Sequence, residues 1–341
     1  MAESILVLTH AEETGPVMTK TSLEVVTAGK ELAARLGASL AIGIVAGDAE
    51  SAASSIAGTG ARVLGVSGQA FAQASYASDA SACEALCKAI QPTIVLAPGS
   101  SRFARVAAGV AHRLSGCVDT HVTSVAGEVG IEVSRWFYRQ RIEAVITRTA
   151  RPWFLLLEAG IYTPFTGVSS EVLVERVAVE LPALRTTVTG MRVPALNAQT
   201  IRPEAAMLFV AGAGWTKKQP DGRTRAADAG DLILGFLHKS GASLGSSKSL
   251  VDQGDDGQPV LPFLTHMNQV GQTGSTPRHA KGLSTCCHGE EPHVVGWRFI
   301  TERRAISLDP NCGWTRGKAD VVYVADAFEV MARVNELLKR D

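Results

Sequence analysis

The chain has 341 residues, of which 46% are hydrophobic and 19% charged, and 33 Lys and Arg residues balance 33 Asp and Glu residues. This neutral composition argues against a nucleic-acid partner. The length and apolar content predict two domains, each with its own core. No apolar run is long enough to span a bilayer and residues 1–5 do not resemble a signal peptide, so we expect a cytoplasmic protein that is not itself membrane-spanning.

Residues 1–190 are expected to form an N-terminal α/β domain. Short apolar runs predict strands at 5–9, 39–45, 62–66 and 93–97. Amphipathic or alanine-rich stretches predict helices at 21–36, 51–56, 79–90 and 102–114. Strands and helices alternate with short links, which is typical of a doubly wound sheet of parallel strands.

The pattern changes after residue 115. Residues 118–125, 131–136, 144–149 and 154–158 have the composition of consecutive strands with turns between them. We expect these four strands to form an antiparallel extension of the first sheet. Trp136, Phe137 and Trp153 are large apolar side chains that we predict to be exposed and available for contact with a partner.

A proline-containing crossover separates the two domains, and we place the linker at 191–204. A second α/β domain is expected at 205–341. Its predicted strands are 207–211, 243–245, 282–286, 305–308 and 321–324, and its main predicted helices are 226–238 and 327–338. Gly212 and Gly214 follow the first of these strands as a G-x-G pair, but Lys217 stands where a dinucleotide fingerprint has its third glycine.

The stretch 269–274 reads Gln-Val-Gly-Gln-Thr-Gly. Glycines let a backbone approach a bulky ligand closely, and the side chains of Gln272 and Thr273 supply directional hydrogen-bond donors. Such a turn can bind phosphate oxygens through successive N–H groups. The alternative is an ordinary surface turn.

The order of motifs in the second domain resembles the C-terminal, FAD-binding domain of the α subunit of electron transfer flavoproteins. That family has Gly-Ala-Ser-Arg-x-x-Val-Asp, Gln-Val-Gly-Gln-Thr-Gly-Lys, Gly-Ile-Ser-Gly-Ala-Ile-Gln-His and Asn-Lys-Asp in succession. This chain has Gly-Ser-Ser-Lys-Ser-Leu-Val-Asp at 245–252, followed by the 269–274 stretch, His293 and Asp309. The spacings from Thr273 to His293 and to Ser307 equal those of the family motifs. The first domain resembles the family mainly in its architecture.

The resemblance implies two doubly wound domains, the second a Rossmann-like FAD-binding domain. The residues it assigns to FAD are Gly212, Gly214, Ser247, Lys248, Val270, Gly271, Gln272, Thr273, Gly274, His288, Gly289, His293, Ser307, Asp309 and Asp326. By the same resemblance, Thr273 lies at flavin N5, His293 lies beside the flavin C2 carbonyl, and Lys248 lies over the ring. Each also has a plainer interpretation, as a turn threonine, a helix-start histidine and a solvated lysine.

The implied function is that of an electron carrier. Family members accept electrons from a flavin dehydrogenase, pass them toward a quinone oxidoreductase and work with a β subunit, so a β-like subunit is the expected partner.

The chain departs from the family pattern at Lys248, Ser275 and Ser307, which replace Arg, Lys and Asn, and at 288–292, where His-Gly-Glu-Glu-Pro retains only the glycine. These departures leave open an alternative from another class, a flavin-less structural subunit of a dehydrogenase complex. The neighbouring His288, Glu290 and Glu291 do not have the spacing to converge on one metal ion.

Overall fold

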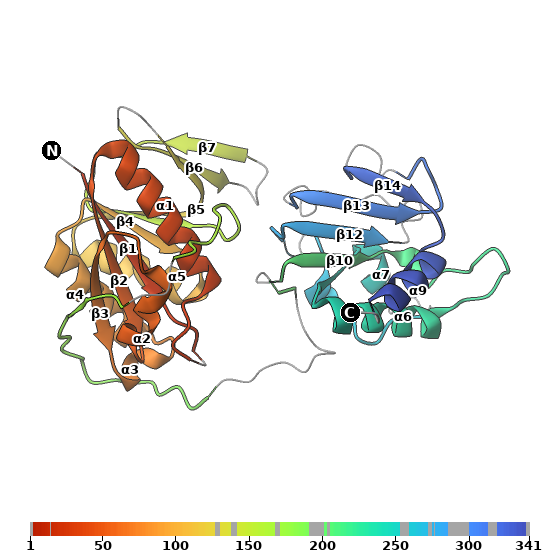
Figure 1. Ribbon diagram of the computed structural model, residues 1–341, viewed down its shortest axis with the longest axis horizontal. Coiled ribbons are helices and arrows are strands. Elements are labelled where there is room, and N and C mark those ends of the chain that lie inside the picture. The colour runs from red at the N-terminus through yellow and green to blue at the C-terminus, as the bar shows by residue number, and fades with distance from the viewer. Residues whose placement is uncertain are drawn as a thin grey trace. The chain divides into compact units, whose positions relative to one another are not determined.

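The structure is a computed structural model. It describes the chain apart from residues 1–2, 14, 127–129, 138–141, 168–170, 191–200, 203–204, 253–258, 272–274, 276, 286–299, 313–318 and 339–341. The chain divides into two compact units, Met1–Met191 and Arg192–Asp341. Figure 1 shows the helices and strands of each unit.

The first unit is built on a nine-stranded sheet with the order β7-β6-β5-β8-β4-β1-β2-β3-β9. Its strands are β1 (Ser4–His10), β2 (Ser39–Ala46), β3 (Arg62–Ser67), β4 (Ile94–Pro98), β5 (Cys117–Ala126), β6 (Glu132–Phe137), β7 (Ile142–Ile146), β8 (Trp153–Leu157) and β9 (Val174–Arg176). Its helices are α1 (Lys20–Leu36), α2 (Ala49–Ala53), α3 (Gln69–Ala72), α4 (Tyr76–Ile90) and α5 (Ser101–Arg113). The predicted strands and helices up to residue 114 are confirmed to within a few residues.

Both faces of the central strands are covered, as the alternation along β1 shows. Ile5 and Val7 pack in one core with α1 and α2, whereas Leu6 and Leu8 pack in a second core with α4 and α5. Because successive side chains of a strand point to opposite faces, a strand that is apolar at every position must be buried between two layers. Gly29 lets α1 approach the sheet closely, since a Cβ there would lie 2.3 Å from Val7 Cγ2.

One part of the predicted topology is wrong. β5, β6 and β7 do form an antiparallel extension, with β6 pairing antiparallel to both neighbours. The strand predicted at 154–158 is β8, however, and it lies between β4 and β5 and is parallel to both. Its sequence, Trp-Phe-Leu-Leu-Leu, is buried at every residue, which is typical of an interior parallel strand.

The second unit has a five-stranded, all-parallel sheet with the order β11-β10-β12-β13-β14. Its elements are β10 (Met207–Ala211), α6 (Ala226–Ser240), β11 (Ser243–Ser246), α7 (Lys248–Asp252), β12 (Lys281–Thr285), β13 (Glu302–Ser307), β14 (Val321–Val324) and α9 (Ala327–Leu337). Short 3₁₀ turns lie at Ala213–Trp215 and His266–Asn268. α6 and α9 pack on one face of the sheet with Phe209 and Ala211, while Leu208 and Val210 pack on the other face with Val270 and Ile300.

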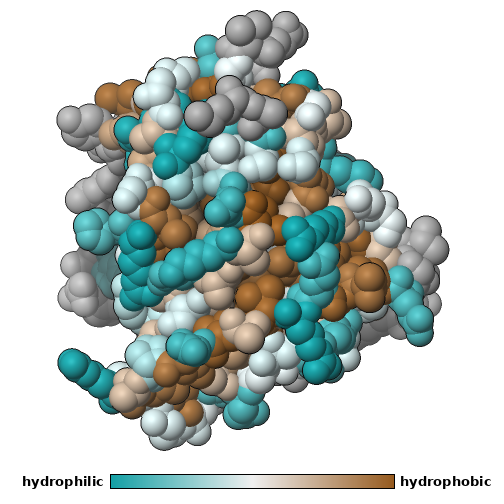
Figure 2. Space-filling model, turned by 90° about the vertical axis from the view of Figure 1, so that its left-hand side faces the viewer, coloured by the Kyte–Doolittle hydropathy of each residue, from teal (hydrophilic) through white to brown (hydrophobic). Residues whose placement is uncertain are grey.

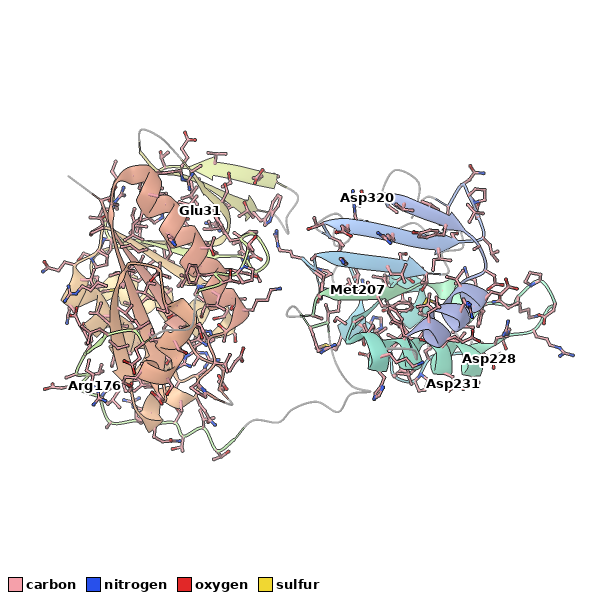
Figure 3. All side chains as sticks on the ribbon, in the orientation of Figure 1. Glu31, Arg176, Met207, Asp228, Asp231 and Asp320 are labelled. Carbon is pink, nitrogen blue, oxygen red and sulfur yellow. The ribbon has the colours of Figure 1, made fainter. Side chains whose placement is uncertain are left out.

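α6 illustrates how the sequence places a helix on this sheet. Ala229, Ile233 and Phe236 are buried against the strands, at the spacing of one helical face. Asp228 and Asp231 are exposed and project from α6 away from the sheet (Figure 3). Gly241 ends the helix at a positive φ of 65°.

Candidate functional site

The strand order of the second unit defines where a ligand would bind. Numbered within the unit, the order is 2-1-3-4-5, so the chain leaves β10 toward β11 on one side and later returns to β12 on the other. In open α/β sheets of this kind, ligands bind beyond the carboxyl ends of the strands at this reversal. The candidate site of this unit is therefore the carboxyl edge around β10 and β12.

Several of the residues assigned to FAD lie at this edge. Gly212 follows β10, Ser247 follows β11, Ser307 ends β13 and Asp326 follows β14 by two residues. Asp309 lies in the turn after β13, where its N–H donates to Ser307 Oγ at 3.2 Å. The parallel sheet thus brings together residues that are more than 110 positions apart in the sequence.

The glycine-containing stretch is joined to the same edge. Val270 N donates to Ser246 O at 3.0 Å, so the stretch continues alongside β11. Gly245 makes this approach possible, since a Cβ there would lie 2.7 Å from Val270 Cγ2. Gly271 has a positive φ of 83°, and its N–H donates to Ser275 O at 2.8 Å. Gln272, Thr273 and Gly274, like His288, Gly289 and His293, lie outside the described residues.

Lys248 begins α7 directly after Ser247. Its Nζ lies 3.2 Å from Asp252 Oδ2, one helical turn along. The other oxygen of Asp252 lies 3.7 Å from His266 Nδ1. Both Lys248 and His266 remain partly exposed, so this carboxylate orients two basic side chains at the edge without burying them.

Trp215 is a residue of this edge that sequence reasoning missed. Its side chain is fully buried, its Nε1 donates to Thr285 Oγ1 at 2.8 Å, and its ring packs edge-on against Phe328 with centroids 4.6 Å apart. It ends the short 3₁₀ turn that contains Gly214, and α6 begins only at Ala226, without a side-chain cap. A dinucleotide fold instead has its glycine turn open directly into the first helix. The Gly212–Gly214 pair therefore lacks that arrangement.

The hydrogen bonds at the edge test whether FAD fits it. The N–H groups of Gly212, Ser247, Val270 and Gly271 all donate to carbonyl groups of the chain. They are therefore not free to bind a phosphate. Side-chain groups remain: Ser247 Oγ accepts from Leu250 N and keeps its own proton to donate, and Lys248 carries a partly exposed cation. Among the described residues, any contact with a polar cofactor at this edge would therefore come from side chains and not from these four N–H groups.

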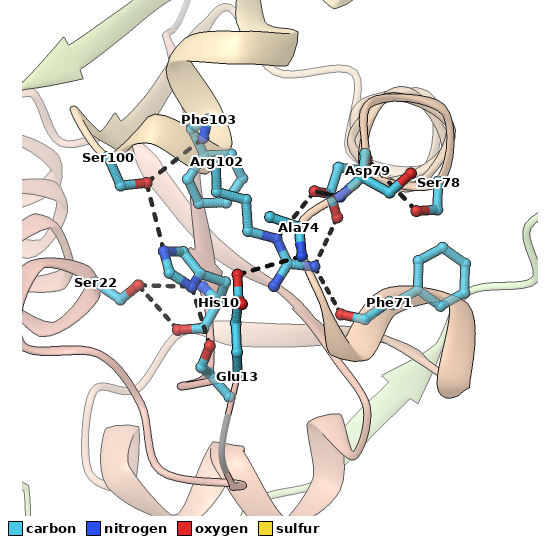
Figure 4. A network of polar contacts seen from close by, with 12 residues as sticks. His10, Glu13, Ser22, Phe71, Ala74, Ser78, Asp79, Ser100, Arg102 and Phe103 are labelled. Carbon is cyan, nitrogen blue, oxygen red and sulfur yellow. Dashed lines mark hydrogen bonds and ion pairs between the residues drawn. The ribbon is translucent and has the colours of Figure 1, made fainter. Parts of the chain in front are cut away.

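The first unit has a polar network at the carboxyl edge of its own sheet. No sequence pattern identifies this network. His10 ends β1, Ser100 caps the N-terminus of α5, and Arg102 lies in the first turn of α5 (Figure 4). Arg102 donates to both oxygens of Asp79 and, at 2.6 Å, to the carbonyl of Phe71. Because Asp79 is on α4, these bonds join α4, α5 and the segment before α4. Burial raises the pKa of Asp79, and the bonds from Arg102 oppose that shift.

His10 occupies the centre of this network. Its Nδ1 lies 3.0 Å from Ala11 O and must donate to it, because a carbonyl can only accept. Its Nε2, 3.4 Å from Ser100 Oγ, is then the acceptor. Burial lowers the pKa of His10 to about 4, helped by the nearby Arg102 and opposed by the bond to Ala11. The network therefore holds a neutral imidazole at this edge.

A second buried cluster corrects the prediction made for Trp153. This residue is fully buried, and its Nε1 donates to Asp119 Oδ2 at 2.9 Å. Asp119 also receives hydrogen bonds from Arg135 and Arg148, which lie on β6 and just after β7. The prediction that Trp153 is exposed is wrong, because β8 lies in the interior of the sheet and is buried at every residue. Of the other two predicted contact residues, Trp136 is half-buried and Phe137 is 39% exposed.

Within the described residues, no helix is both long and apolar enough to cross a bilayer, and no three potential metal ligands are grouped together. Hydrophobic and hydrophilic residues lie next to one another on the face drawn in Figure 2.

Comparison with known proteins identifies the family. The electron transfer flavoprotein domain matches residues 7–185, which is more than half of the chain. The chain therefore belongs to the electron transfer flavoprotein family. The match lies in the first unit, whereas the motifs that carry the sequence resemblance lie in the second.

No curated protein matches the chain in sequence. Among solved structures, SsfS6, a glycosyltransferase of Streptomyces sp. SF2575, is 12% identical, with 99% of this chain and 91% of that chain covered. Its TM-score of 0.25 is too low to say anything about fold or chemistry.

Proposed function

We propose that the chain is an α-like subunit of an electron transfer flavoprotein, which carries electrons on FAD from a flavin dehydrogenase toward a quinone oxidoreductase. Family membership supports a role in electron transfer. The observation that supports FAD in the second unit is the convergence of Gly212, Ser247 and Ser307 on the carboxyl edge of a sheet with the 2-1-3-4-5 order. The proposed partner is a β-like subunit.

In this proposal the bound flavin supplies the redox chemistry, and the protein supplies binding and charge. The Ser247 hydroxyl donates to a polar atom of the cofactor. The Lys248 ammonium, held by Asp252, places a positive charge at the edge, which favours negative charge on a ligand there. Lysine lacks the planar, forked donors of the family's arginine, so it supplies charge without stacking.

The release of flavin tests this function. The chain is purified together with its partner and denatured, and the flavin in the supernatant is quantified by absorbance. We expect about one FAD per chain. A complex that contains the chain but releases no flavin would support the structural-subunit alternative, which the internal pairing of the four backbone N–H groups at the edge favours.

Variants at Lys248 distinguish FAD binding at the carboxyl edge of the second unit from FAD binding elsewhere on the chain. Lys248→Ala is expected to lower the flavin content of the purified complex, because it removes the cation from the edge. Lys248→Arg keeps the charge and is expected to retain flavin. Lys88→Ala, at an exposed lysine of the first unit that pairs with Glu84, is the control and should leave flavin content unchanged.

A further inference from the structure

Three ionisable side chains meet just after β11 in the second unit. Lys248 and Asp252 lie one helical turn apart on α7, and His266 begins the 3₁₀ turn His266–Asn268. Lys248 Nζ is 3.2 Å from Asp252 Oδ2, and His266 Nδ1 is 3.7 Å from Asp252 Oδ1. One carboxylate therefore has a basic side chain beside each of its oxygens. The function proposed for this edge uses Lys248 and leaves His266 without a role.

The turn that carries His266 is held in place against β11. Thr265 Oγ1 accepts from Met267 N at 3.2 Å, and Asn268 Oδ1 accepts from Thr265 N at 3.1 Å. Asn268 Nδ2 donates to Leu244 O of β11 at 3.2 Å. The side chain of His266 is nevertheless 62% exposed. Its backbone is therefore fixed, while its ring stays open to solvent and to a ligand.

The net charge of this triad of Lys248, Asp252 and His266 depends on a single proton. Lys248 and Asp252 carry opposite charges that cancel, so the triad is neutral when His266 is neutral and positive when His266 is protonated. Histidine is the side chain that normally changes charge between pH 5 and 8. The other elements packed against α7 and the turn are β11 and the 3₁₀ turn Ala213–Trp215, and neither carries an ionisable side chain.

The triad is close enough to the carboxyl edge to act on a ligand there. α7 begins directly after Ser247 and has five residues, so it extends about 7.5 Å at 1.5 Å per residue. At 0.1 M salt the field of an exposed charge persists over about 10 Å. The turn that carries His266 leads into Val270, whose N–H donates to Ser246 O at the end of β11.

We propose that His266 is a further residue of the cofactor edge, positioned by Asp252 beside Lys248, and that its protonated form strengthens the binding of an anionic ligand. The inference rests on the proposed function, because FAD supplies the anion through its pyrophosphate. Protonated His266 adds a positive charge that the pair of Lys248 and Asp252, neutral overall, does not supply. Because all three side chains are partly exposed, solvent weakens the effect, and we expect about a threefold change in affinity.

Two substitutions at His266 fix its charge. His266→Gln stays neutral and His266→Lys stays positive at every pH used. His238→Gln is the matched control, because His238 is an exposed histidine near the end of α6, just before β11 begins, and so lies at the amino edge of the same sheet. The full chain, with any partner it retains, is freed of flavin, and its affinity for added FAD is measured at pH 8 and pH 6 in low salt.

Each affinity is compared with that of the unsubstituted chain at the same pH, which cancels the pH dependence that other groups contribute. At pH 6 the unsubstituted chain should bind FAD about threefold more tightly than His266→Gln and as tightly as His266→Lys. At pH 8 it should match His266→Gln and bind about threefold more weakly than His266→Lys. His238→Gln should match the unsubstituted chain at both pH values. A ratio to His266→Gln that is the same at both pH values overturns the inference.

Proton uptake provides a readout that a purely structural role of His266 does not change. Protonation and ligand binding favour one another reciprocally, so FAD binding at pH 7 should take up protons, and His266→Gln should take up fewer. Calorimetry in buffers of different ionisation enthalpy measures this number. Equal uptake by both proteins overturns the inference. FAD binding that does not depend on His266 leaves the proposed function intact, whereas the absence of FAD binding at either pH overturns both.

Discussion

His10 is only 8% exposed, and its ring nitrogens lie within hydrogen-bond distance of Ala11 O and Ser100 Oγ. Burial lowers its pKa from 6.5 to about 4. The unfolded chain therefore takes up a proton at higher pH than the folded chain does. Stability rises with pH wherever the unfolded state binds more protons, so the folded state loses stability as the pH falls from about 6.5 toward 4.

This gives the first prediction. Between pH 7 and pH 4 the unsubstituted protein should lose about 3 kcal/mol more unfolding free energy than His10→Gln, which has no proton to gain. Urea unfolding at a series of pH values measures the difference. Asp79 and Glu24, buried acids with raised pKa, act in the opposite direction but equally in both proteins. The exposed His112→Gln should behave like the unsubstituted chain, and equal pH slopes for all three would contradict the assignment.

The carboxylate of Asp119 joins three elements of the first unit through its bonds to Arg135, Arg148 and Trp153. Burial raises the pKa of Asp119, but the hydrogen bonds from Arg148, Trp153 and Arg135 outweigh this and hold it below its usual value. Asp119→Ala should cost about 3 kcal/mol, because it leaves a buried indole N–H and an arginine without their partner. Glu175→Ala breaks the exposed pair with Arg62 and is the control. If both substitutions cost the same in chemical unfolding, the Asp119 cluster is not a structural anchor.

For single residues, the sequence predicts well which ones lie at strand ends, but it predicts poorly which distant residues a side chain contacts. Gly212 is recognisable because it follows the apolar run 207–211, and Ser247 because it comes shortly after the short strand predicted at 243–245. Trp215 is not, because its burial depends on Thr285 and Phe328, which are 70 and 113 positions away. The same holds for Arg102 and Asp79, where only the packing of α5 on α4 makes an ion pair of two distant charges.

Among the elements, β8 shows that an apolar run predicts a strand but not the position of that strand in the sheet. Its position after three strands suggests a fourth antiparallel strand, but its five buried residues need cover on both faces. Only the interior of the sheet, between β4 and β5, provides that cover. Burial on both faces is therefore a better guide to strand position than order in the chain.

α9 provides a prediction at the scale of one element. Asp326, which the resemblance assigns to FAD, caps this helix: its Oδ1 accepts from Phe328 N at 2.7 Å. Asp326→Ala should therefore lower the stability of the second unit by about 1 kcal/mol, whereas Asp326→Asn should preserve it, since the amide oxygen can accept the same bond. Thermal unfolding followed by circular dichroism compares the two. An equal loss in both variants would show that the charge, and not the cap, is what matters.

Across the whole molecule, each unit has cores of its own. The apolar cores of the first unit draw on residues up to 179, and those of the second unit on residues from 201 onward. No described residue belongs to a core of both units. Each unit should therefore unfold as a cooperative block, and a ligand of one should stabilise that one alone.

Because the two units have separate apolar cores, calorimetry can show which unit binds the flavin. Calorimetry of the full chain, with any partner it retains, should show a separate transition for each unit, and residues 3–190 expressed alone should reproduce the first. Added FAD should raise only the transition of the second unit, by about 2.7 kcal/mol when free FAD is a hundred times its dissociation constant. A ligand that binds the native state of one unit cannot stabilise another whose unfolding is independent. If FAD instead raises the transition of the 3–190 fragment, the flavin binds at the carboxyl edge of β1 and β4, and the second unit has another role.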